Sequence, residues 1–266
     1  MRIWLQEPAP EKLAPLYFKD LRARVKSLAR PDAKVEVQDC DVGIPLNLRS
    51  QYFRHLYKEE MIDRILKAEK QGYDAAGIAC LLDIGLQEAR EVCNIPVAGM
   101  FESSILVACM LGKTFSIIPT SEKIGVYWKD LVRAYGFEDR ATSFPIMKGI
   151  KDNIVDFGKA FEDPGLARTV ISNFKAAAQE AAQKGAEVIL PGCGLLSILL
   201  LKNNVLEVEG AVVLDEVGAL LKMAESLGDL AAKAHMRTSR KCTYLQPPQE
   251  VFEQVRKKYR PPKAYP

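Results

Sequence analysis

The stretch Ala68-Glu-Lys-Gln-Gly72-Tyr-Asp-Ala-Ala-Gly-Ile-Ala-Cys80 has a counterpart later in the chain, Ala181-Ala-Gln-Lys-Gly185-Ala-Glu-Val-Ile-Leu-Pro-Gly-Cys193. In both, a helical segment ends at a glycine, which can take the left-handed conformation that stops a helix. An acidic residue comes two positions after the glycine, and a cysteine ends an apolar strand eight positions after it. This equal spacing predicts that the two thiols face each other across an internal pseudo-twofold axis.

The two halves of the chain share an order of elements. Each half is predicted to open with a strand, to pass through an amphipathic helix, and to continue beyond its cysteine with a further helix and strand. Strands that alternate with helices predict mostly parallel sheets. The expected strands are 2–5, 95–98, 114–118 and 211–214, and the expected helices are 58–70, 85–92, 167–184, 195–202 and 216–227.

We therefore expect an α/β fold of two similar flavodoxin-like lobes with mostly parallel sheets. Residues 1–98 with 211–236 would form the first lobe, 99–210 the second, and 237–266 a basic, proline-containing C-terminal extension. Ligands of open α/β sheets bind beyond the carboxyl ends of the strands. Cys80 and Cys193 would thus both point into an active-site cleft between the lobes.

Composition limits the class of protein. A chain of 266 residues with 48% hydrophobic and 27% charged residues is typical of one large or two ordinary globular α/β domains. The first apolar run, Ile3-Trp-Leu5, is too short for a signal peptide, and no segment approaches the roughly 20 apolar residues of a membrane span. We expect a cytoplasmic protein with no membrane partner.

The cysteine and histidine content argues against metal or disulfide frameworks. There are six cysteines without a C-x-x-C pair, and two histidines. Free thiols and no metal are therefore expected. The four cysteines outside the repeat are interpreted as structural: Cys40, Cys93, Cys109 and Cys242.

The extension differs in charge from the rest of the chain. Residues 237–266 carry eight Lys or Arg and two Glu, a charge of +6 within an overall charge of +3. Clustered cations such as Arg256-Lys-Lys-Tyr-Arg260 bind phosphate backbones. Charge runs are more typical of solvated or subunit-packing segments, so we expect no nucleic-acid partner.

With these motifs in view, the sequence resembles the aspartate/glutamate racemase superfamily, and most closely its hydantoin racemase branch, over about residues 1–235. The run Ala79-Cys-x-x-Asp-x-Gly-Leu-x-x-Ala-Arg90 is fairly specific to that branch. The matching stretches are 45–52, 72–90, 95–104, 111–116 and 185–193.

The resemblance implies a racemase that uses neither pyridoxal phosphate nor another cofactor, with Cys80 and Cys193 as acid/base catalysts of a 1,1-proton transfer. One thiolate would remove the proton from a stereogenic carbon beside a carbonyl, and the opposed thiol would protonate the other face. Each cysteine precedes a predicted helix, whose N–H groups would lower the thiol pKa. The resemblance also implies a small-molecule substrate and a homo-oligomer.

Some residues depart from the branch. Its amino-terminal strand typically ends in an Asn-Pro-Asn-Thr-like loop, whereas this chain has Gln6-Glu-Pro-Ala-Pro10. Arg49 stands where Glu is usual, and Pro191 where Leu is usual. We hypothesise that Arg49 accommodates an anionic substituent. The expected substrate is a hydantoin-like cyclic ureide or a related carbon acid.

The candidate substrate-binding residues surround the cysteines or follow the first strand of each half. Asp83 is interpreted as a helix cap, beside N–H groups that could hold a substrate carbonyl, and Glu102 as either a cap or a support for the site. The candidate substrate-binding set is Gln6, Asn47, Arg49, Leu81, Leu82, Pro119, Thr120, Gly192 and Gly194.

Three hypotheses are compatible with these residues. The first is the racemase. The second is a cofactor-free decarboxylase or cis-trans isomerase of the same superfamily, of the arylmalonate or maleate type. The third is a non-catalytic binding or assembly protein, supported by the basic tail and the altered first loop. Retention of two cysteines favours racemisation, because a decarboxylase needs a proton on one face only.

Overall fold

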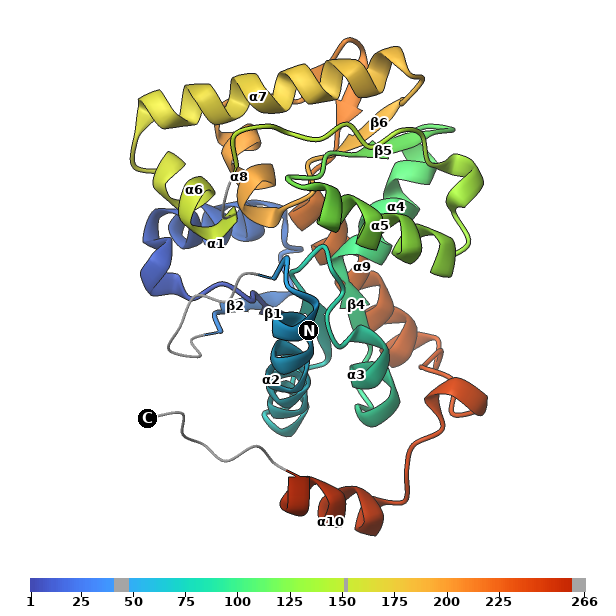
Figure 1. Cartoon of the computed structure of the whole chain (residues 1–266). Coiled ribbons are helices and arrows are strands. Elements are labelled where there is room, and N and C mark those ends of the chain that lie inside the picture. Colours follow the sequence, from blue (N-terminus) through green and yellow to red (C-terminus); the bar gives the residue numbers. More distant parts are fainter. Residues whose placement is uncertain (41–47, 151–152, 260–266) are drawn as a thin grey trace.

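The computed structural model describes residues 1–40, 48–150 and 153–259, and it contains two four-stranded sheets (Figure 1). The first sheet has the order β2-β1-β3-β4, and its strands are all parallel. Three of these strands are almost wholly buried, as expected of a parallel sheet covered on both faces. Their bounds are β1 Arg2–Gln6, β2 Lys34–Gln38, β3 Ala75–Ile78 and β4 Val97–Gly99.

The second sheet has the order β5-β6-β8-β7. Its first three strands are parallel, and β7 pairs antiparallel with β8 through a tight turn. Two mostly parallel sheets confirm the expected α/β fold. The strand bounds are β5 Phe115–Ile117, β6 Val188–Leu190, β7 Glu207–Val208 and β8 Ala211–Val213.

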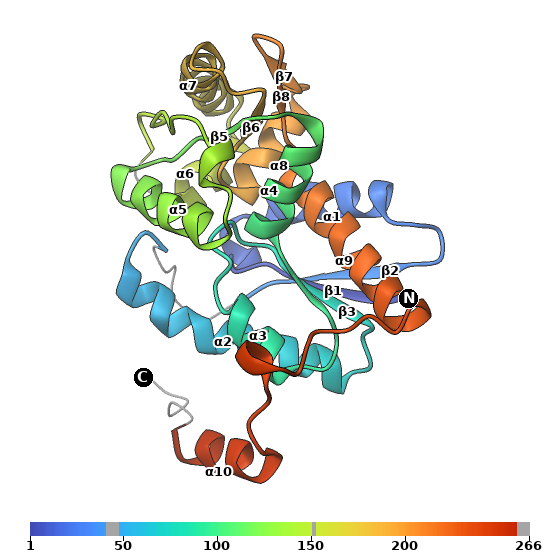
Figure 2. The ribbon, with the colours of Figure 1, turned by 90° about the vertical axis from the view of Figure 1, so that its right-hand side faces the viewer.

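Helices cover both sheets and fill the space between them (Figures 1 and 2). Helix α8 packs against α1, α6 and α9 and is buried along most of its length, which explains its uniformly apolar sequence. The bounds are α1 Pro15–Leu28, α2 Gln51–Lys70, α3 Leu86–Val92, α4 Met100–Leu111, α5 Glu122–Ala134, α6 Asn153–Ala160, α7 Pro164–Gln183, α8 Gly194–Lys202, α9 Glu216–Lys233 and α10 Gln249–Tyr259. Short 3-10 turns lie at Glu11–Leu13, Glu138–Arg140 and Cys242–Tyr244.

The repeat seen in the sequence has a structural counterpart. Gly72 and Gly185 end α2 and α7 with φ values of 74° and 91°. The acidic residues two positions later also act alike. Asp74 accepts a hydrogen bond of 2.7 Å from the backbone N–H of Arg2, and Glu187 accepts one of 2.5 Å from that of Lys113. Each acid thus ties its strand to the start of the neighbouring strand.

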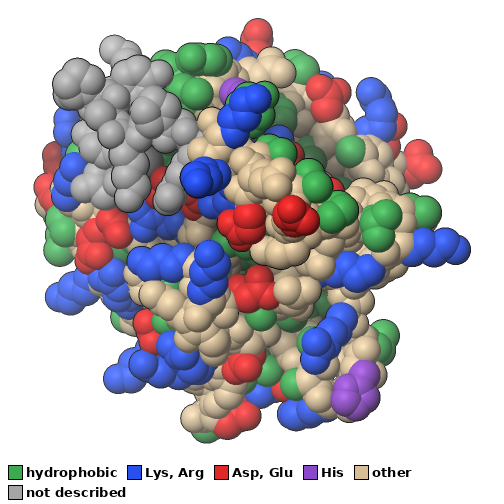
Figure 3. Space-filling view, turned by 90° about the horizontal axis from the view of Figure 1, so that it is seen from below, with side chains coloured by type: hydrophobic (Ala, Val, Ile, Leu, Met, Phe, Trp, Pro, Cys, Tyr) green, Lys and Arg blue, Asp and Glu red, His purple; other side chains and the backbone are tan. Residues whose placement is uncertain are grey.

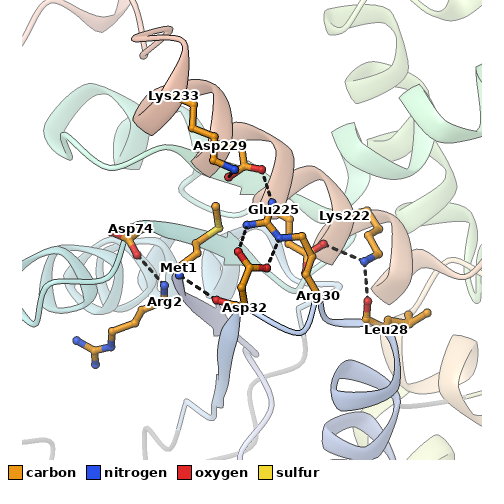
Figure 4. Close-up of polar contacts among 10 residues, drawn as sticks. All are labelled: Met1, Arg2, Leu28, Arg30, Asp32, Asp74, Lys222, Glu225, Asp229 and Lys233. Atoms are coloured by element: carbon orange, nitrogen blue, oxygen red, sulfur yellow. Dashed lines mark hydrogen bonds and ion pairs between the residues drawn. The ribbon is translucent and has the colours of Figure 1, made fainter.

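Helix α9 links the two sheets. It packs beside α4 and α8, and it also covers β3 and β4. Figure 4 shows how polar contacts fix it to the first lobe: Arg30 contacts Asp229, and the backbone N–H of Arg30 donates to Glu225 at 2.9 Å. The amino group of Met1 donates to the carbonyl of Asp32 in the same cluster.

The strand expected at 211–214 forms β8, which pairs with β6 of the second sheet. The chain leaves this sheet only after Val213 and enters α9 at Glu216. We propose a first lobe of residues 1–98 with α9, and a second lobe of residues 99–213.

The C-terminal extension is more ordered than its prolines suggest. It contains α10, and Figure 2 shows it running from the end of α9 past α3. Arg240 donates hydrogen bonds to the carbonyls of Arg90 and Glu91 at the end of α3, and Arg256 pairs with Asp63 of α2. Within the described ranges, no helix is both long and apolar enough to cross a membrane.

Candidate active site

Cys80 and Cys193 lie beyond the carboxyl ends of β3 and β6, at equivalent positions of the two sheets. Cys80 is 6% exposed, whereas Cys193 is partly exposed and caps the start of α8. The thiols lie close enough that a charge on Cys193 raises the pKa of Cys80. All six cysteines are free thiols.

Burial raises the pKa of both thiols, and backbone N–H groups oppose it. The pKa of Cys193 rises to about 12, because burial outweighs hydrogen bonds from the N–H groups of Leu196 and Leu195. Burial likewise raises the pKa of Cys80, and the N–H of Leu82 lowers it. Each sulfur therefore has a backbone donor that favours its thiolate.

The expectation that each cysteine directly precedes a helix is right for Cys193 and wrong for Cys80. After Cys80 the chain makes a turn in which the N–H of Asp83 donates to the carbonyl of Cys80, and α3 begins only at Leu86. Asp83 has φ 43° and Gly85 has φ 78°, so the chain reverses direction before the helix can start. The donor to Cys80 thus comes from a turn.

A buried carboxyl group lies beside both thiols. Glu7, directly after β1, is 2% exposed, and its Oε2 accepts a hydrogen bond of 2.9 Å from the Tyr17 hydroxyl. Burial raises the pKa of Glu7 to about 8. A negative charge on Glu7 would raise the pKa of Cys80 and of Cys193. Glu7 is therefore a third titratable group of the site.

A second buried carboxyl group supports the Cys193 loop. Glu216, the first residue of α9, accepts a 2.8 Å hydrogen bond from the N–H of Gly192. Burial raises its pKa to about 8. Gly192 has φ +83°, and a Cβ there would lie 2.6 Å from the Ile118 carbonyl oxygen. Glycine is therefore required where the loop passes the end of β5.

Three aromatic residues of the second lobe hold the turn after Cys80. The indole Nε1 of Trp128 donates to the Leu81 carbonyl at 2.8 Å, and the Tyr127 hydroxyl donates to the Leu82 carbonyl at 3.0 Å. Tyr135 is the C-cap residue of α5, and its hydroxyl donates to the Asp83 carboxylate at 2.8 Å. Two residues of α5 and its C-cap residue thus form hydrogen bonds with three successive residues of the first lobe, Leu81 to Asp83.

Asp83 caps a helix other than the expected one. Its carboxylate accepts the N–H groups of Phe101 and Glu102 at the start of α4. Burial raises the pKa of Asp83 to about 7. The carboxylate of Glu102 pairs with Arg90 of α3. These two acids therefore tie α4 to the turn after Cys80 and to α3.

The predicted substrate-binding residues have different surroundings. Leu81, Leu82 and Gly192 lie in the loops that carry the two cysteines. A Cβ added to Gly194 would lie 3.4 Å from the Tyr17 hydroxyl oxygen, so the Gly194 backbone faces that hydroxyl. The backbone carbonyl of Pro119 accepts a hydrogen bond from the N–H of Met147.

Thr120 is buried after β5, and Arg49 donates from Nη2 to the carbonyl of Ile150 at 3.2 Å. Asn47 lies outside the described residues.

Gln6 is directed into its own lobe. Its side-chain oxygen accepts from the Trp4 indole at 3.0 Å, and its amide nitrogen donates to the carbonyls of Glu7 and Asp39. The alternation of side chains along a strand turns Gln6 and Glu7 to opposite sides. We propose Glu7 as a further residue of the site.

Sequence reasoning did not single out Glu7, Tyr17, Trp128 or Glu216. The sequence could have indicated Glu7, because it lies in the Gln6–Pro10 loop, which departs from the Asn-Pro-Asn-Thr-like loop of the hydantoin racemase branch. Tyr17 and Trp128 belong to apolar helix faces and look like ordinary core residues. Their polar atoms acquire a role only in the folded chain, where the Tyr17 hydroxyl donates to Glu7 and the Trp128 indole to the Leu81 carbonyl.

Comparison with known families decides the class of protein. The family model described as Asp/Glu/Hydantoin racemase matches residues 16–224. The chain belongs to this family. A hydantoin racemase from Pseudomonas sp. (strain NS671) is 33% identical to the chain over 235 residues, 88% of each protein. The family and this relative indicate an isomerase of the racemase type.

Solved structures show that the chain has the fold of this racemase family. The allantoin racemase from Pseudomonas fluorescens superposes with a TM-score of 0.74 and 23% identity, over 93% of this chain and 97% of that one. The allantoin racemase from Klebsiella pneumoniae gives a TM-score of 0.71 at 22% identity, over 93% and 94% of the two chains. The family model and the hydantoin racemase relative confirm the expected family resemblance.

Proposed function

We propose that the chain is a cofactor-independent racemase in which Cys80 and Cys193 move a proton at a carbon next to a carbonyl. The observation that carries the proposal is the placement of both thiols beyond equivalent strand ends, close enough that a charge on Cys193 raises the pKa of Cys80. Two acid/base groups on opposite faces of a carbon are what inversion by deprotonation and reprotonation requires.

The proton balance follows from one ionised and one neutral thiol. The thiolate takes the proton from the substrate carbon, leaving a carbanion delocalised onto the carbonyl, and the opposed thiol donates its proton to the other face. The two cysteines then have exchanged protonation states. Burial raises the pKa of both thiols, so thiolate formation depends on the N–H groups of Leu82 and of Leu195 and Leu196.

We propose a hydantoin-like cyclic ureide, or a related carbon acid, as the substrate. The relatives named hydantoin racemase and the solved allantoin racemases support this class. Glu7 and Glu216 are buried, and burial raises the pKa of each to about 8. The same burial disfavours any further charge beside the thiols, so an anionic substituent would have to extend away from them.

Arg49 is the proposed partner for such a substituent. Its Nη2 reaches the carbonyl of Ile150 in the other lobe, so its guanidinium lies where the two lobes meet. We expect Arg49→Glu to lower kcat/KM for substrates with an anionic side chain more than for alkyl-substituted ones. An unchanged substrate profile would contradict this role.

The test is solvent deuterium incorporation. Enantiopure 5-substituted hydantoins, allantoin and amino acids are incubated in D2O with the wild type, Cys80→Ala and Cys193→Ala, and followed by mass spectrometry and polarimetry. Exchange with loss of rotation, abolished by either substitution, would support the two-thiol racemase. Cys93→Ala is the matched control, because Cys93 is a buried free thiol behind α3.

Other outcomes would redirect the assignment. Turnover of arylmalonates or maleate without racemisation would favour the decarboxylase or cis-trans isomerase alternative. Inversion that survives loss of both thiols would overturn the proposed mechanism. Binding without any turnover, lost when the chain is truncated at Arg237, would favour the non-catalytic hypothesis.

We further propose a cytoplasmic homo-oligomer that binds neither membranes nor nucleic acid. Figure 3 shows cationic and anionic side chains interspersed over the face seen from below, a pattern that does not concentrate one sign of charge. Light scattering after size exclusion would test the oligomer, and salt-dependent gel shifts with mixed RNA and DNA would test nucleic-acid binding.

A further inference from the structure

One peptide unit connects Trp128 to the sulfur of Cys80. The carbonyl of Leu81 accepts the 2.8 Å hydrogen bond from the Trp128 indole. The N–H of Leu82 belongs to the same peptide unit, and it is the backbone donor to Cys80. The indole N–H and the thiol thus occupy opposite ends of one peptide dipole.

This chain of hydrogen bonds is shielded from water. Trp128 is 2% exposed, and Leu81 and Leu82 are also buried. Hydrogen bonds in series polarise one another, and a low local dielectric strengthens each of them. A donor to the carbonyl therefore makes the N–H of the same peptide a better donor to a thiolate.

The ring of Trp128 also contacts the other cysteine loop. A Cβ added to Gly192 would lie 2.7 Å from Cη2 of Trp128, so the ring rests against the residue that precedes Cys193. The ring stacks on Phe101 of α4, with an interplanar angle of 13°. One rigid side chain therefore contacts the residue after Cys80 and the residue before Cys193.

We propose that Trp128 is a positioning residue that tunes Cys80: its indole N–H polarises the Leu81–Leu82 peptide, whose N–H stabilises the Cys80 thiolate, while its ring sets the place of the Cys193 loop. The proposal rests on the proposed function in treating Cys80 as a reacting group. It assigns to Trp128 no contact with the substrate.

Other titratable groups face Cys80, and the variants compared must leave the charges among them unchanged. They come from every element around it, and none of them is altered by a change at Trp128. They are Glu7 after β1, Tyr17 of α1, Tyr57 of α2, Asp83 of its own turn, Tyr127 of α5 and Cys193 at the start of α8. Tyr127, which the control below alters, is uncharged because burial raises its pKa above the ordinary 10.

The chain offers a matched control for Trp128→Phe. Tyr127→Phe also removes one hydrogen bond from α5 to the turn, that to the Leu82 carbonyl. The N–H of that next peptide belongs to Asp83 and donates to the carbonyl oxygen of Cys80, not to its sulfur. Both variants lose one hydrogen bond between the lobes. Only Trp128→Phe removes a hydrogen bond from the series that runs from the indole through the Leu81–Leu82 peptide to the Cys80 sulfur.

The readout is the rate of alkylation of Cys80 by iodoacetamide against pH, followed by peptide mass spectrometry. Trypsin cleavage after Lys70 and Arg90 gives a peptide whose one cysteine is Cys80, and cleavage after Lys184 and Lys202 does the same for Cys193. We expect Trp128→Phe to slow Cys80 alkylation at pH 8 about twofold to fourfold, a fraction of the effect of losing one whole hydrogen bond to a charged group, and to move its pH–rate curve to higher pH.

Tyr127→Phe should leave the dependence of the Cys80 alkylation rate on pH unchanged. Equal shifts in the two variants, or a shift at Cys193 as large as at Cys80, would overturn the proposal. Alkylation needs no substrate, so the result stands whether or not the racemase assignment does. A chain that alkylates as expected but exchanges no substrate would count against the function alone.

A second variant removes the N–H while keeping the ring. Site-specific incorporation of 3-benzothienylalanine at position 128 replaces the indole nitrogen with sulfur, so packing against Phe101 and Gly192 is preserved even if Trp128→Phe fails to fold. The same shift at Cys80 is expected. An unshifted curve in this variant would contradict the proposal.

Discussion

The hydroxyl of Tyr17 donates a 2.9 Å hydrogen bond to the carboxyl group of Glu7, and both side chains are buried beside the two cysteines. The bond joins α1 to the loop after β1. It also places an acid that is mostly neutral at pH 7 next to two thiols that must change charge in the proposed reaction.

The first prediction concerns the pH dependence of stability. The pKa of Glu7 rises on folding from its ordinary 4.5 to about 8. The folded state therefore holds a proton that the unfolded chain releases, and the free energy of unfolding falls as pH rises from about 4.5 to 8. Glu7→Gln should make this fall shallower by up to ~1.4 kcal/mol per pH unit.

Urea titrations at pH 5, 6.5 and 8 would measure this slope. Glu216 and Asp83 also have raised pKa values, so the slope should shrink without vanishing. Parallel stability curves for the wild type and Glu7→Gln would show that Glu7 ionises normally in the folded chain.

The second prediction compares two glycines with left-handed backbone. Gly192 and Gly210 have φ values of +83° and +79°. An added Cβ at Gly192 meets the Ile118 carbonyl and Trp128, whereas at Gly210 it meets no described heavy atom within 4 Å. Gly210→Ala should cost about 1 kcal/mol from backbone strain, and Gly192→Ala about 3 kcal/mol or more. Chemical denaturation would separate the two, and equal losses would refute the close approach.

The third prediction concerns the Asp83 cap. Its carboxylate accepts two N–H groups of α4 and the Tyr135 hydroxyl. Asp83→Ala leaves these donors buried and unpaired and should cost roughly 2–4 kcal/mol. Tyr135→Phe removes one donor and should cost about 1 kcal/mol. Thermal and urea unfolding would measure both losses in the free energy of unfolding. A larger loss in Tyr135→Phe than in Asp83→Ala would contradict the role of Asp83 as the cap.

The fourth prediction concerns the extension. Arg240 bonds to carbonyls at the end of α3, where unpaired carbonyls and the helix dipole favour a cation. Arg240→Ala should lower the free energy of unfolding by about 1–2 kcal/mol. Lys241→Ala removes the same charge from the next residue and is the control. If both substitutions have the same effect, net charge rather than helix capping explains it.

Much of the fold could be predicted because local rules decide it. Gly72 and Gly185 end helices in the left-handed conformation as expected, and the strands after them are buried and parallel. The sheet to which residues 211–213 belong could not be read from the sequence, because strand pairing is non-local and β8 pairs with β6 only in the folded chain. The helix α10 was not expected, since paired prolines flank it.

The sequence by itself determined the repeat, the equivalent placement of Cys80 and Cys193, and the family, because periodicity, glycine conformation and motif spacing are properties of neighbouring residues. The tertiary structure alone decided that Glu7 lies beside the thiols, and that Trp128 bridges the two cysteine loops. Burial and hydrogen bonding set those roles, and both arise only when residues distant in the chain exclude water together.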